Sequence, residues 1–303
     1  MSSRRRILWS ANDPGGANAV MPVVEALVAR GDEVGEHIAN PAIFLAGTSV
    51  SPDSADKKFL ESHPEVPSVY VLDFWGNYRM RFTVASGALL VPTVFCVIDE
   101  SAKRGAIAEG IPADHIVVTG NPYFEHFADR VTRAHEEKGR VLFISQPIRA
   151  DAGAAYGFDE YQALEDVKSE IERLDGLELA IQLHPRDDVH KFDHYLGTTT
   201  ALSTDPLDHA LSRAGLVVGM FSPVLIQAAA AGKPVLSYQP GGTRDPLPTN
   251  RLGLTRKASG REQLREALAE YAAGTYQSAP VRVGDLWPKG ATERIVNVID
   301  RLI

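Results

Sequence analysis

Apolar runs alternate with segments of helical period along most of the chain. A run at 7–9 precedes a stretch in which Val20, Val23 and Leu27 recur at the spacing of one helix face. A new run at 141–144 starts the same alternation again in the second half. Strands that alternate with helices are typical of parallel α/β proteins. The pattern therefore predicts an α/β fold with two Rossmann-like domains.

The same pattern places further elements along the chain. Strands are expected at 34–38, 69–72, 94–98, 116–118, 179–181, 216–218 and 235–237, and helices at 101–109, 224–231 and 291–303. Asp205 and Pro206 are the residue types of an N-cap and a first helical position, so they predict a helix start. Residues 46–67 show no clear period, and we expect a loop there.

A polar, charged segment at 128–139 separates the two halves. We place the domain boundary within it, so that residues 1–135 form the first domain and residues 136–303 the second. It remains open at this point whether the terminal helix at 291–303 returns to the first domain.

Composition narrows the classes of partner and cofactor. With 303 residues, 44% of them hydrophobic, the chain can bury a large core. Its 31 basic and 39 acidic residues give a formal charge of −8, which disfavours nucleic acid as partner. No apolar run approaches the ~20 residues of a membrane span. The single cysteine, Cys96, excludes an internal disulfide and a cysteine-based zinc site. We expect a cytoplasmic protein without metal or cofactor; peripheral membrane contact and oligomeric state stay open.

A glycine-containing loop follows the first predicted strand. It contains Asp13, Gly15 and Gly16, and paired glycines permit positive φ and a close approach of the backbone to a ligand. Ligands of open α/β sheets bind beyond the carboxyl ends of the strands, where this loop must lie. Asp13 is the only carboxylate of the loop, and it is either a general base or a cap of the following turn.

Residues 219–238 read as strand, tight turn, short helix and strand. Ser222 and Pro223 open the helix, and Gly232 ends it. A helix N-terminus offers free N–H groups and a positive dipole end to an anion. The segment is therefore either an ordinary βαβ unit or a phosphate site.

His184, Pro185 and Arg186 follow a strand of the second domain. Pro185 ends the strand, so His184 lies at a turn, where histidine and arginine could neutralise a diphosphate. The alternative is surface pairing with Asp187 and Asp188. Because this turn and the turn at Ser222 fall at successive strand ends, we favour a phosphate site.

Other polar segments are less informative. Asn121 belongs either to a simple Gly-Pro turn or to a loop facing a ligand between the domains. The aromatic and basic loop at 73–82 carries Arg79 and Arg81, which either clamp an anionic acceptor or cover the core. His190 and His194 are spaced like metal ligands, but a solvated charged patch is the favoured interpretation.

With these residues in view, the chain resembles the GT-B superfamily of nucleotide-sugar glycosyltransferases and UDP-N-acetylglucosamine 2-epimerases. The similar segments are DPGG at 13–16, GIP at 110–112 with IVVTGNP at 116–122, His184-Pro185, and the donor-site segment at 219–234. The resemblance implies two Rossmann-like domains with parallel sheets facing a central cleft. It places the ribose-binding glutamate of the family at Gln227, which bears no charge. The epimerase carboxylate motifs are not recognisable, and Asp99-Glu100 is the nearest acidic pair.

The resemblance implies an inverting, metal-independent glycosyltransferase of cell-surface glycan or secondary-metabolite biosynthesis, with a small-molecule, glycan or lipid-linked acceptor. The alternatives are a nucleotide-sugar hydrolase or 2-epimerase, and an inactive module that binds a nucleotide-sugar or a partner. The expected site residues are, for catalysis, Asp13 and His184; for the donor, Gly15, Gly16, Asn121, Gln146, His184, Arg186, Phe221, Ser222, Pro223 and Gln227; and for the acceptor, Asn18, Arg79 and Arg81.

Overall fold

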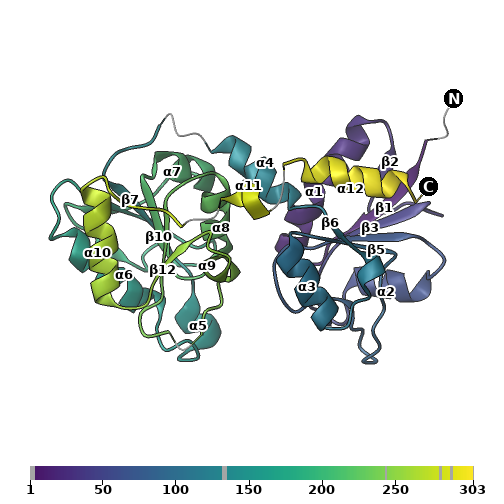
Figure 1. Cartoon of the computed structure of the whole chain (residues 1–303), viewed down its shortest axis with the longest axis horizontal. Helices are drawn as coiled ribbons and strands as arrows, with labels where there is room; N and C mark the ends of the chain where they lie inside the picture. Colours follow the sequence, from purple (N-terminus) through teal and green to yellow (C-terminus); the bar gives the residue numbers. More distant parts are fainter. Residues whose placement is uncertain (1–3, 132–134, 243, 280–281, 287–288, 303) are drawn as a thin grey trace. The chain divides into compact units, whose positions relative to one another are not determined.

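The chain forms two α/β units, each built on its own sheet (Figure 1). The computed structural model describes all residues except 1–3, 132–134, 243, 280–281, 287–288 and 303. The first unit comprises residues Met1–His126 and Gly284–Ile303, and the second comprises Phe127–Val283. The chain thus changes unit at residue 127, whereas the polar segment placed the boundary after residue 135.

Six parallel strands form the sheet of the first unit. Their spatial order is β2-β1-β3-β4-β5-β6, so β1, β3 and β4 are neighbours. The strands are β1 (Arg6–Ser10), β2 (Glu33–Gly35), β3 (Ile43–Gly47), β4 (Ser68–Val71), β5 (Val94–Val97) and β6 (Ile116–Val118). Because all pairs are parallel, every carboxyl end reaches the same edge, and the loops at that edge hold the polar groups described below.

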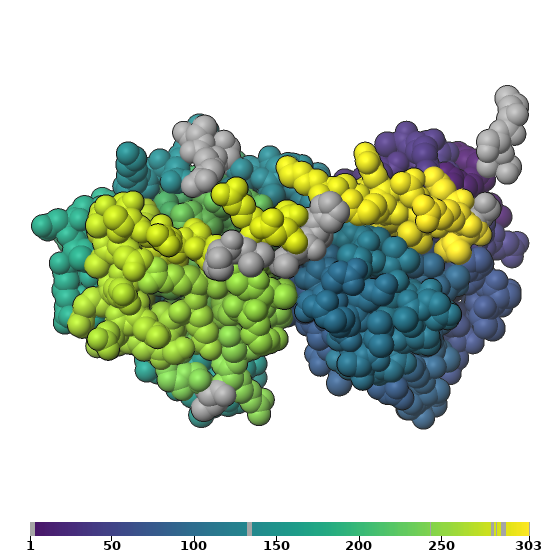
Figure 2. Space-filling model, in the orientation of Figure 1, coloured from purple at the N-terminus to yellow at the C-terminus, as the bar shows by residue number. Residues whose placement is uncertain are grey.

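The helices of the first unit connect these strands. They are α1 (Pro14–Ala29), α2 (Ala55–Ser62), α3 (Glu100–Ala108), the start of α4 (Pro122–Arg130) and α12 (Ala291–Asp300), with short 3-10 turns at Met80–Phe82 and Ala113–His115. The terminal helix α12 lies against α1 and shares its core, where Ile295 and Ile299 are buried beside Val20 and Val24. Figure 2 shows these yellow C-terminal residues on the surface of the first unit.

The second unit repeats the same architecture. Its strand order is β12-β11-β10-β7-β8-β9, and all pairs are parallel. The strands are β7 (Arg140–Ile144), β8 (Glu178–Gln182), β9 (Thr200–Leu202), β10 (Leu216–Gly219), β11 (Val235–Tyr238) and β12 (Arg256–Ala258). The central strand β7 therefore lies between β8 and β10.

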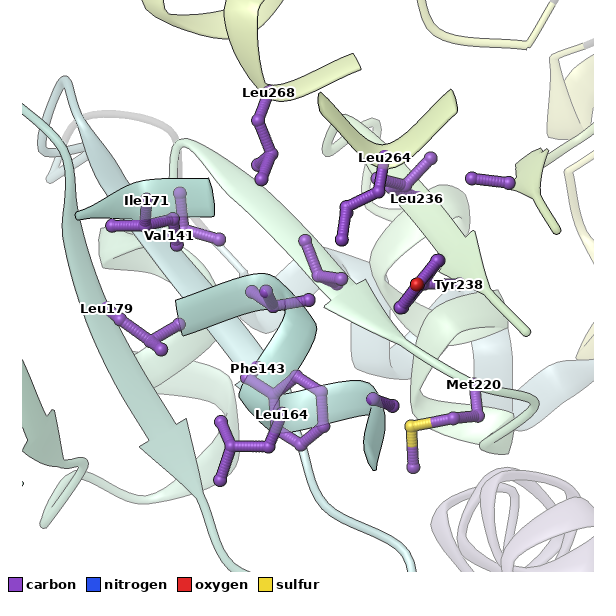
Figure 3. Packing of buried hydrophobic residues seen from close by; sticks show 14 of the residues in the cluster. Val141, Phe143, Leu164, Ile171, Leu179, Met220, Leu236, Tyr238, Leu264 and Leu268 are labelled. Atoms are coloured by element: carbon purple, nitrogen blue, oxygen red, sulfur yellow. The ribbon is translucent and has the colours of Figure 1, made fainter. Parts of the chain in front are cut away.

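One face of this second sheet packs against α6 and α10. The helices of the unit are α5 (Ile148–Ala152), α6 (Glu160–Ile171), α7 (Leu207–Arg213), α8 (Pro223–Ala230), α9 (Pro248–Arg251) and α10 (Arg261–Ala272). A 3-10 turn lies at Asp193–Tyr195. Helix α11 (Val283–Leu286) begins at Val283, the last residue of the second unit. Phe143 and Leu236 of the sheet meet Leu164 of α6 and Leu264 and Leu268 of α10 in one buried cluster (Figure 3). Burial of this apolar surface is the main stabilising contribution.

Two local expectations were wrong. The segment 46–67 contains the end of β3 and the helix α2. Helix α7 starts after Pro206, without a side-chain cap, because the Asp205 carboxylate binds Arg213 instead (Oδ2–Nη1 2.6 Å). By contrast, the start of α8 is confirmed, since Ser222 is its N-cap and Pro223 its first residue. None of the described helices has the length and apolar character needed to cross a membrane.

Candidate functional site

The carboxyl edge of the second sheet brings together three predicted site residues. Gln146 follows β7, His184 follows β8 and Ser222 follows β10, and these three strands are neighbours. The expectation that His184 and Ser222 end successive strands is wrong, because β9 lies between β8 and β10 along the chain and β7 lies between them in the sheet. Neighbouring strands are ~4.8 Å apart, so the two turns are separated by about two strand spacings.

Gln146 ties two of these turns together. Its side-chain oxygen accepts the backbone N–H of Phe221 at 2.9 Å. The next residue, Ser222, caps α8, and its Oγ accepts the N–H of Val224 at 3.2 Å. The positive end of the α8 dipole is thereby fixed at this edge, in the position that an anion prefers. The ring of Phe221 packs against Tyr156 (centroids 4.7 Å apart).

Two hydrogen bonds fix the ring and backbone of His184. Its backbone N–H donates to Asp187 Oδ2 at 3.0 Å, and its Nδ1 accepts the N–H of Arg186 at 3.1 Å. A neutral imidazole whose Nδ1 accepts must carry its proton on Nε2. Burial, followed by the nearby Arg186 charge, lowers the pKa of His184. The ring is therefore a neutral N–H donor at neutral pH.

Asp187 belongs to a buried charge network. Its side chain is 2% exposed, and it accepts from Ser145 Oγ at 2.6 Å and from Lys191 Nζ at 2.7 Å. Lys191 also pairs with the buried Glu160 at 2.9 Å. Burial alone raises the pKa of Asp187, but the hydrogen bonds from Lys191 and Ser145 outweigh it and hold the pKa below its ordinary value. The alternative of a surface pair at Asp187 is therefore wrong.

Arg186, predicted to bind phosphate, is bound to a carboxylate. Its Nη1 and Nη2 donate to the two carboxylate oxygens of Asp151 at 3.0 and 2.5 Å. Both side chains are exposed (62% and 46%), so water screens the pair. An anion that takes the guanidinium fork has to displace Asp151.

Gln227 lies on α8 and is 7% exposed. Its side-chain oxygen is buried and has no hydrogen-bond partner among the described residues. A buried acceptor without a donor is costly, by about 1–3 kcal/mol. A ligand hydroxyl reaching this oxygen would remove that cost.

At the carboxyl edge of the first sheet, Asp13 and the glycines have structural roles. Asp13 is the N-cap of α1, and its Oδ1 accepts the N–H of Gly16 at 2.9 Å. Neither Gly15 nor Gly16 has positive φ, so the expected use of that freedom is wrong. Gly16 is required by packing instead, since a Cβ there would lie 2.9 Å from the carbonyl oxygen of Thr48.

Sequence reasoning missed Asp73, which the structure places at the centre of this edge. Its Oδ1 accepts from Arg81 Nη1 at 2.6 Å and from Thr48 Oγ1 at 3.0 Å. Its Oδ2 lies 2.5 Å from the position of a Cβ on Gly15, and Asp13 Oδ1 lies 3.5 Å from the same position. Two carboxylates therefore border the space above Gly15. The available signal was that Asp73 directly follows the run at 69–72.

The residues expected at the acceptor do not gather at one place. Arg81 is 5% exposed, and all of its donating nitrogens bind Asp73, Thr48 and backbone oxygens. Arg79 is exposed and lies beside Gly110, past the end of α3. Asn18 is exposed on α1. Arg81 is thus a support for Asp73 and not an open anion clamp.

Two further polar residues lie in the loops that follow strands of the first sheet. Asn121 donates to the backbone oxygen of Asp73 at 3.2 Å and caps α4 by accepting from the N–H of Phe124 at 3.0 Å. Asp99 accepts from Trp75 Nε1 at 3.0 Å, and its pKa is raised, mainly by burial. Both side chains stabilise loops at the edge where Asp73 lies.

No group of three or more His, Cys, Asp or Glu side chains that could hold a metal ion occurs among the described residues. His190 pairs with Asp193 (Nδ1–Oδ2 2.8 Å), and both side chains are exposed. This agrees with a solvated patch at the histidine pair.

Comparisons with solved structures identify the architecture. A putative UDP-N-acetylglucosamine 2-epimerase from Listeria monocytogenes matches with a TM-score of 0.68 and 15% identity, covering 98% of this chain and 96% of that chain. UDP-GlcNAc 2-epimerase from Neisseria meningitidis, bound to UDP-GlcNAc, matches with a TM-score of 0.65 and 12% identity over 97% and 99%. The chain has the GT-B fold. The glycotransferase of kitacinnamycin shares this GT-B fold, with a TM-score of 0.63 and 15% identity over 99% of both chains.

No protein-family model matches the chain, and no curated protein matches its sequence. The GT-B fold is therefore what the chain demonstrably shares with these enzymes, and the substrate has to be argued from its own side chains.

Proposed function

We propose that the chain is an enzyme that binds a nucleotide-sugar at the carboxyl edge of its second sheet and transfers the sugar to an acceptor hydroxyl. One observation carries the proposal: the hydrogen bond from Phe221 to Gln146 holds the N-terminus of α8 at the edge that also bears His184. The GT-B neighbours include structures with UDP and UDP-GlcNAc bound, which supports a ligand of this class.

Each group has a role that its chemistry allows. The α8 N-terminus at Ser222 and the Nε2–H of His184 donate to phosphate oxygens, and the buried oxygen of Gln227 accepts from a ribose hydroxyl. When the sugar–phosphate bond breaks, the same donors stabilise the negative charge on the leaving phosphate. In the first unit, Asp13 and Asp73 are the carboxylates able to take the proton of an acceptor hydroxyl.

A specific observation also favours a second candidate, a 2-epimerase. Inversion at a carbon that carries hydrogen needs one group to remove the proton and another to return it to the opposite face. Asp13 and Asp73 supply two carboxylates beside Gly15, with Asp73 held by Arg81. This pair was not recognisable as a motif in the sequence.

Donor binding is tested first. A thermal-shift panel of UDP, CMP, CDP, GDP and dTDP with their sugars is expected to raise the melting temperature for one base, because a ligand of the native state stabilises it. His184→Asn keeps an acceptor for the Arg186 N–H and removes the Nε2–H donor. We expect this variant to stay folded and to lose most of the shift. A panel without any stabilising nucleotide would contradict the proposal.

Incubation of the binding donor in D2O distinguishes the two reactions. An epimerase exchanges the hydrogen at carbon 2 for deuterium without an acceptor, which NMR detects. A glycosyltransferase leaves that hydrogen in place and releases nucleotide only when an acceptor is supplied. Binding without either outcome over a broad acceptor panel would indicate a non-catalytic nucleotide-sugar binder.

A further inference from the structure

The turn after β8 is held by a carboxylate that has no direct place in the proposed reaction. Asp187 Oδ2 accepts both the His184 N–H and the Ser145 hydroxyl, and so joins the ends of β7 and β8. Its Oδ1 accepts from Lys191, which is 8% exposed. The aspartate therefore fixes the backbone from which the histidine ring projects.

We propose that Asp187 is a positioning residue that keeps His184 as a neutral Nε2–H donor by holding the turn at 184–187. The part of this inference that concerns phosphate binding rests on the proposed function. The part that concerns the ring itself does not.

The hydrogen bonds of the turn oppose protonation of the ring. The N–H of Arg186 points at Nδ1, so a proton on Nδ1 would face another donor and break that bond. The charged groups around the ring are Arg186 and Lys191, together with Asp151 and Asp187. Arg186 is paired with Asp151, and Lys191 with Asp187 and Glu160, so each cation near the ring has a carboxylate partner, and the charge of Arg186 still opposes protonation of His184.

A ring that acts as a neutral donor has a distinct pH signature. Each phosphate of UDP-GlcNAc carries one ester bond, the shared anhydride bond and a single strongly acidic oxygen, so the diphosphate keeps its charge between pH 5.5 and 8. If His184 bound them as a cation, affinity would rise as pH falls through the histidine pKa. A neutral Nε2–H donor predicts affinity that does not rise on acidification.

NMR of the histidine nitrogens in the full chain measures the tautomer and the charge of the His184 ring directly. The signal of His184, one of nine histidines, is assigned by its loss in His184→Asn. We expect the Nε2–H tautomer in the wild-type protein at neutral pH. A charged ring or an Nδ1–H tautomer there would overturn the proposal.

Asp187→Asn should change the pKa of His184 in opposite directions for the two possible roles of the carboxylate. If Asp187 acts only by charge, its loss lowers the pKa of His184 further, because a stabilising negative charge disappears. If it holds the turn, its loss releases Nδ1 and exposes the ring, and the pKa rises toward that of free histidine. We expect a rise, and a fall would overturn the proposal.

Asp188→Asn is the matched control, because it removes the same charge one residue further on. Asp188 is exposed and its Oδ1 accepts from the N–H of His190, not from His184. Its substitution is expected to leave the tautomer and pKa of His184 unchanged.

If Asp187→Asn fails to fold, Ser145→Ala takes its place, since it removes one hydrogen bond from Asp187 and keeps the charge. The pKa of His184 should then rise by a smaller amount, and an unchanged value would count against the proposal.

A double-variant cycle tests whether Asp187 acts on the ligand through His184. We expect Asp187→Asn and His184→Asn each to weaken UDP-GlcNAc binding about tenfold, and the double variant to bind no more weakly than His184→Asn alone. Additive losses would contradict a positioning role. If UDP-GlcNAc does not bind the wild-type protein, the proposed ligand is wrong, and the NMR measurements still decide the role of Asp187.

Discussion

Asp73 and Arg81 form a partly buried ion pair at the carboxyl edge of the first sheet, with Asp73 Oδ1 and Arg81 Nη1 at 2.6 Å. The guanidinium also donates to Thr48 and to the carbonyl oxygens of Phe74 and Gly76. The pair therefore fixes the loop after β4 and orients one oxygen of Asp73 toward Gly15.

Replacing Arg81 by methionine should destabilise the protein strongly. The change leaves Asp73 without its cation and two loop carbonyls without their donor, and we expect the free energy of unfolding to fall by about 3 kcal/mol. Urea unfolding measures the loss. The control is Arg79→Gln, an exposed arginine of the same loop, for which a change within about 0.5 kcal/mol is expected. Equal losses in the two variants would show that the ion pair is not what stabilises the loop.

A methyl group at Gly15 should remove activity without unfolding the chain. Gly15 lies in the first turn of α1 with negative φ, so alanine is allowed there, but its Cβ would lie 2.5 Å from Asp73 Oδ2 and displace that carboxylate. Since the carboxylate can shift while Arg81 still pairs with it, we expect a small fall in melting temperature and a loss of turnover of at least about tenfold.

Gly47→Ala is the contrasting variant. Its Cβ would lie 2.2 Å from the backbone oxygen of Gly16, where no side chain can move aside, and we expect a loss of about 1–3 kcal/mol or more. Full activity in Gly15→Ala would exclude a catalytic role for Asp73.

Replacing Asp151 by asparagine should strengthen nucleotide binding. The carboxylate of Asp151 occupies both Nη atoms of Arg186, and its removal frees the guanidinium for a phosphate. Because the pair is exposed, the expected gain in affinity is modest, about two- to fivefold in calorimetric titration. Arg186→Gln should lose affinity instead. A loss of affinity in Asp151→Asn would mean that the carboxylate itself contacts the ligand or orders its site.

Asp56 should make the protein less stable as pH rises. Its side chain is fully buried, and burial raises its pKa more than the interactions with Ser54 and the local backbone lower it. For an acid whose pKa is higher in the folded state, stability is complete below the unfolded pKa and is lost as pH rises through the folded one.

Asp56→Asn should therefore flatten the dependence of unfolding free energy on pH above the ordinary pKa of an aspartate. Asp53→Asn is the control, because it removes an exposed carboxylate of the preceding loop. If wild type and Asp56→Asn show the same pH profile, Asp56 is not the group that titrates.

The alternation of apolar runs and helical segments was sufficient to predict the parallel α/β fold, because each strand buried on both faces must be apolar. It was insufficient for β3 and α2. Ile43–Gly47 was not recognised next to the polar stretch that follows, and α2 buries two charged residues, Asp56 and Lys57, which break its apolar pattern.

The second-sheet site was predictable in part because its residues follow strand ends directly. Parallel pairing then forces Gln146, His184 and Ser222 to one edge. The strand order, which places β7 between the turns at His184 and Ser222, could not be predicted from the sequence. Nor could the pairing of Arg186 with Asp151, since the two residues are distant along the chain.

Gly15 and Gly16 also show which contacts the sequence alone does not predict. Their presence after β1 was interpreted as a sign of positive φ and of a nearby ligand, whereas in the structure the atoms that leave no room for a side chain belong to Gly47, Thr48 and the carboxylate of Asp73. A glycine motif indicates that a side chain does not fit at these positions, but it does not identify the neighbouring atoms that exclude one.

The return of α12 to α1 has a practical consequence for dissecting the chain. The second unit is one uninterrupted stretch, 127–283, although a cut at its start would divide helix α4. The first unit is assembled from both ends of the sequence, so a fragment that stops at residue 126 would expose the apolar side of α1 that Ile295 and Ile299 cover. Joining 284–303 to that fragment through a short linker is the way to study it in isolation.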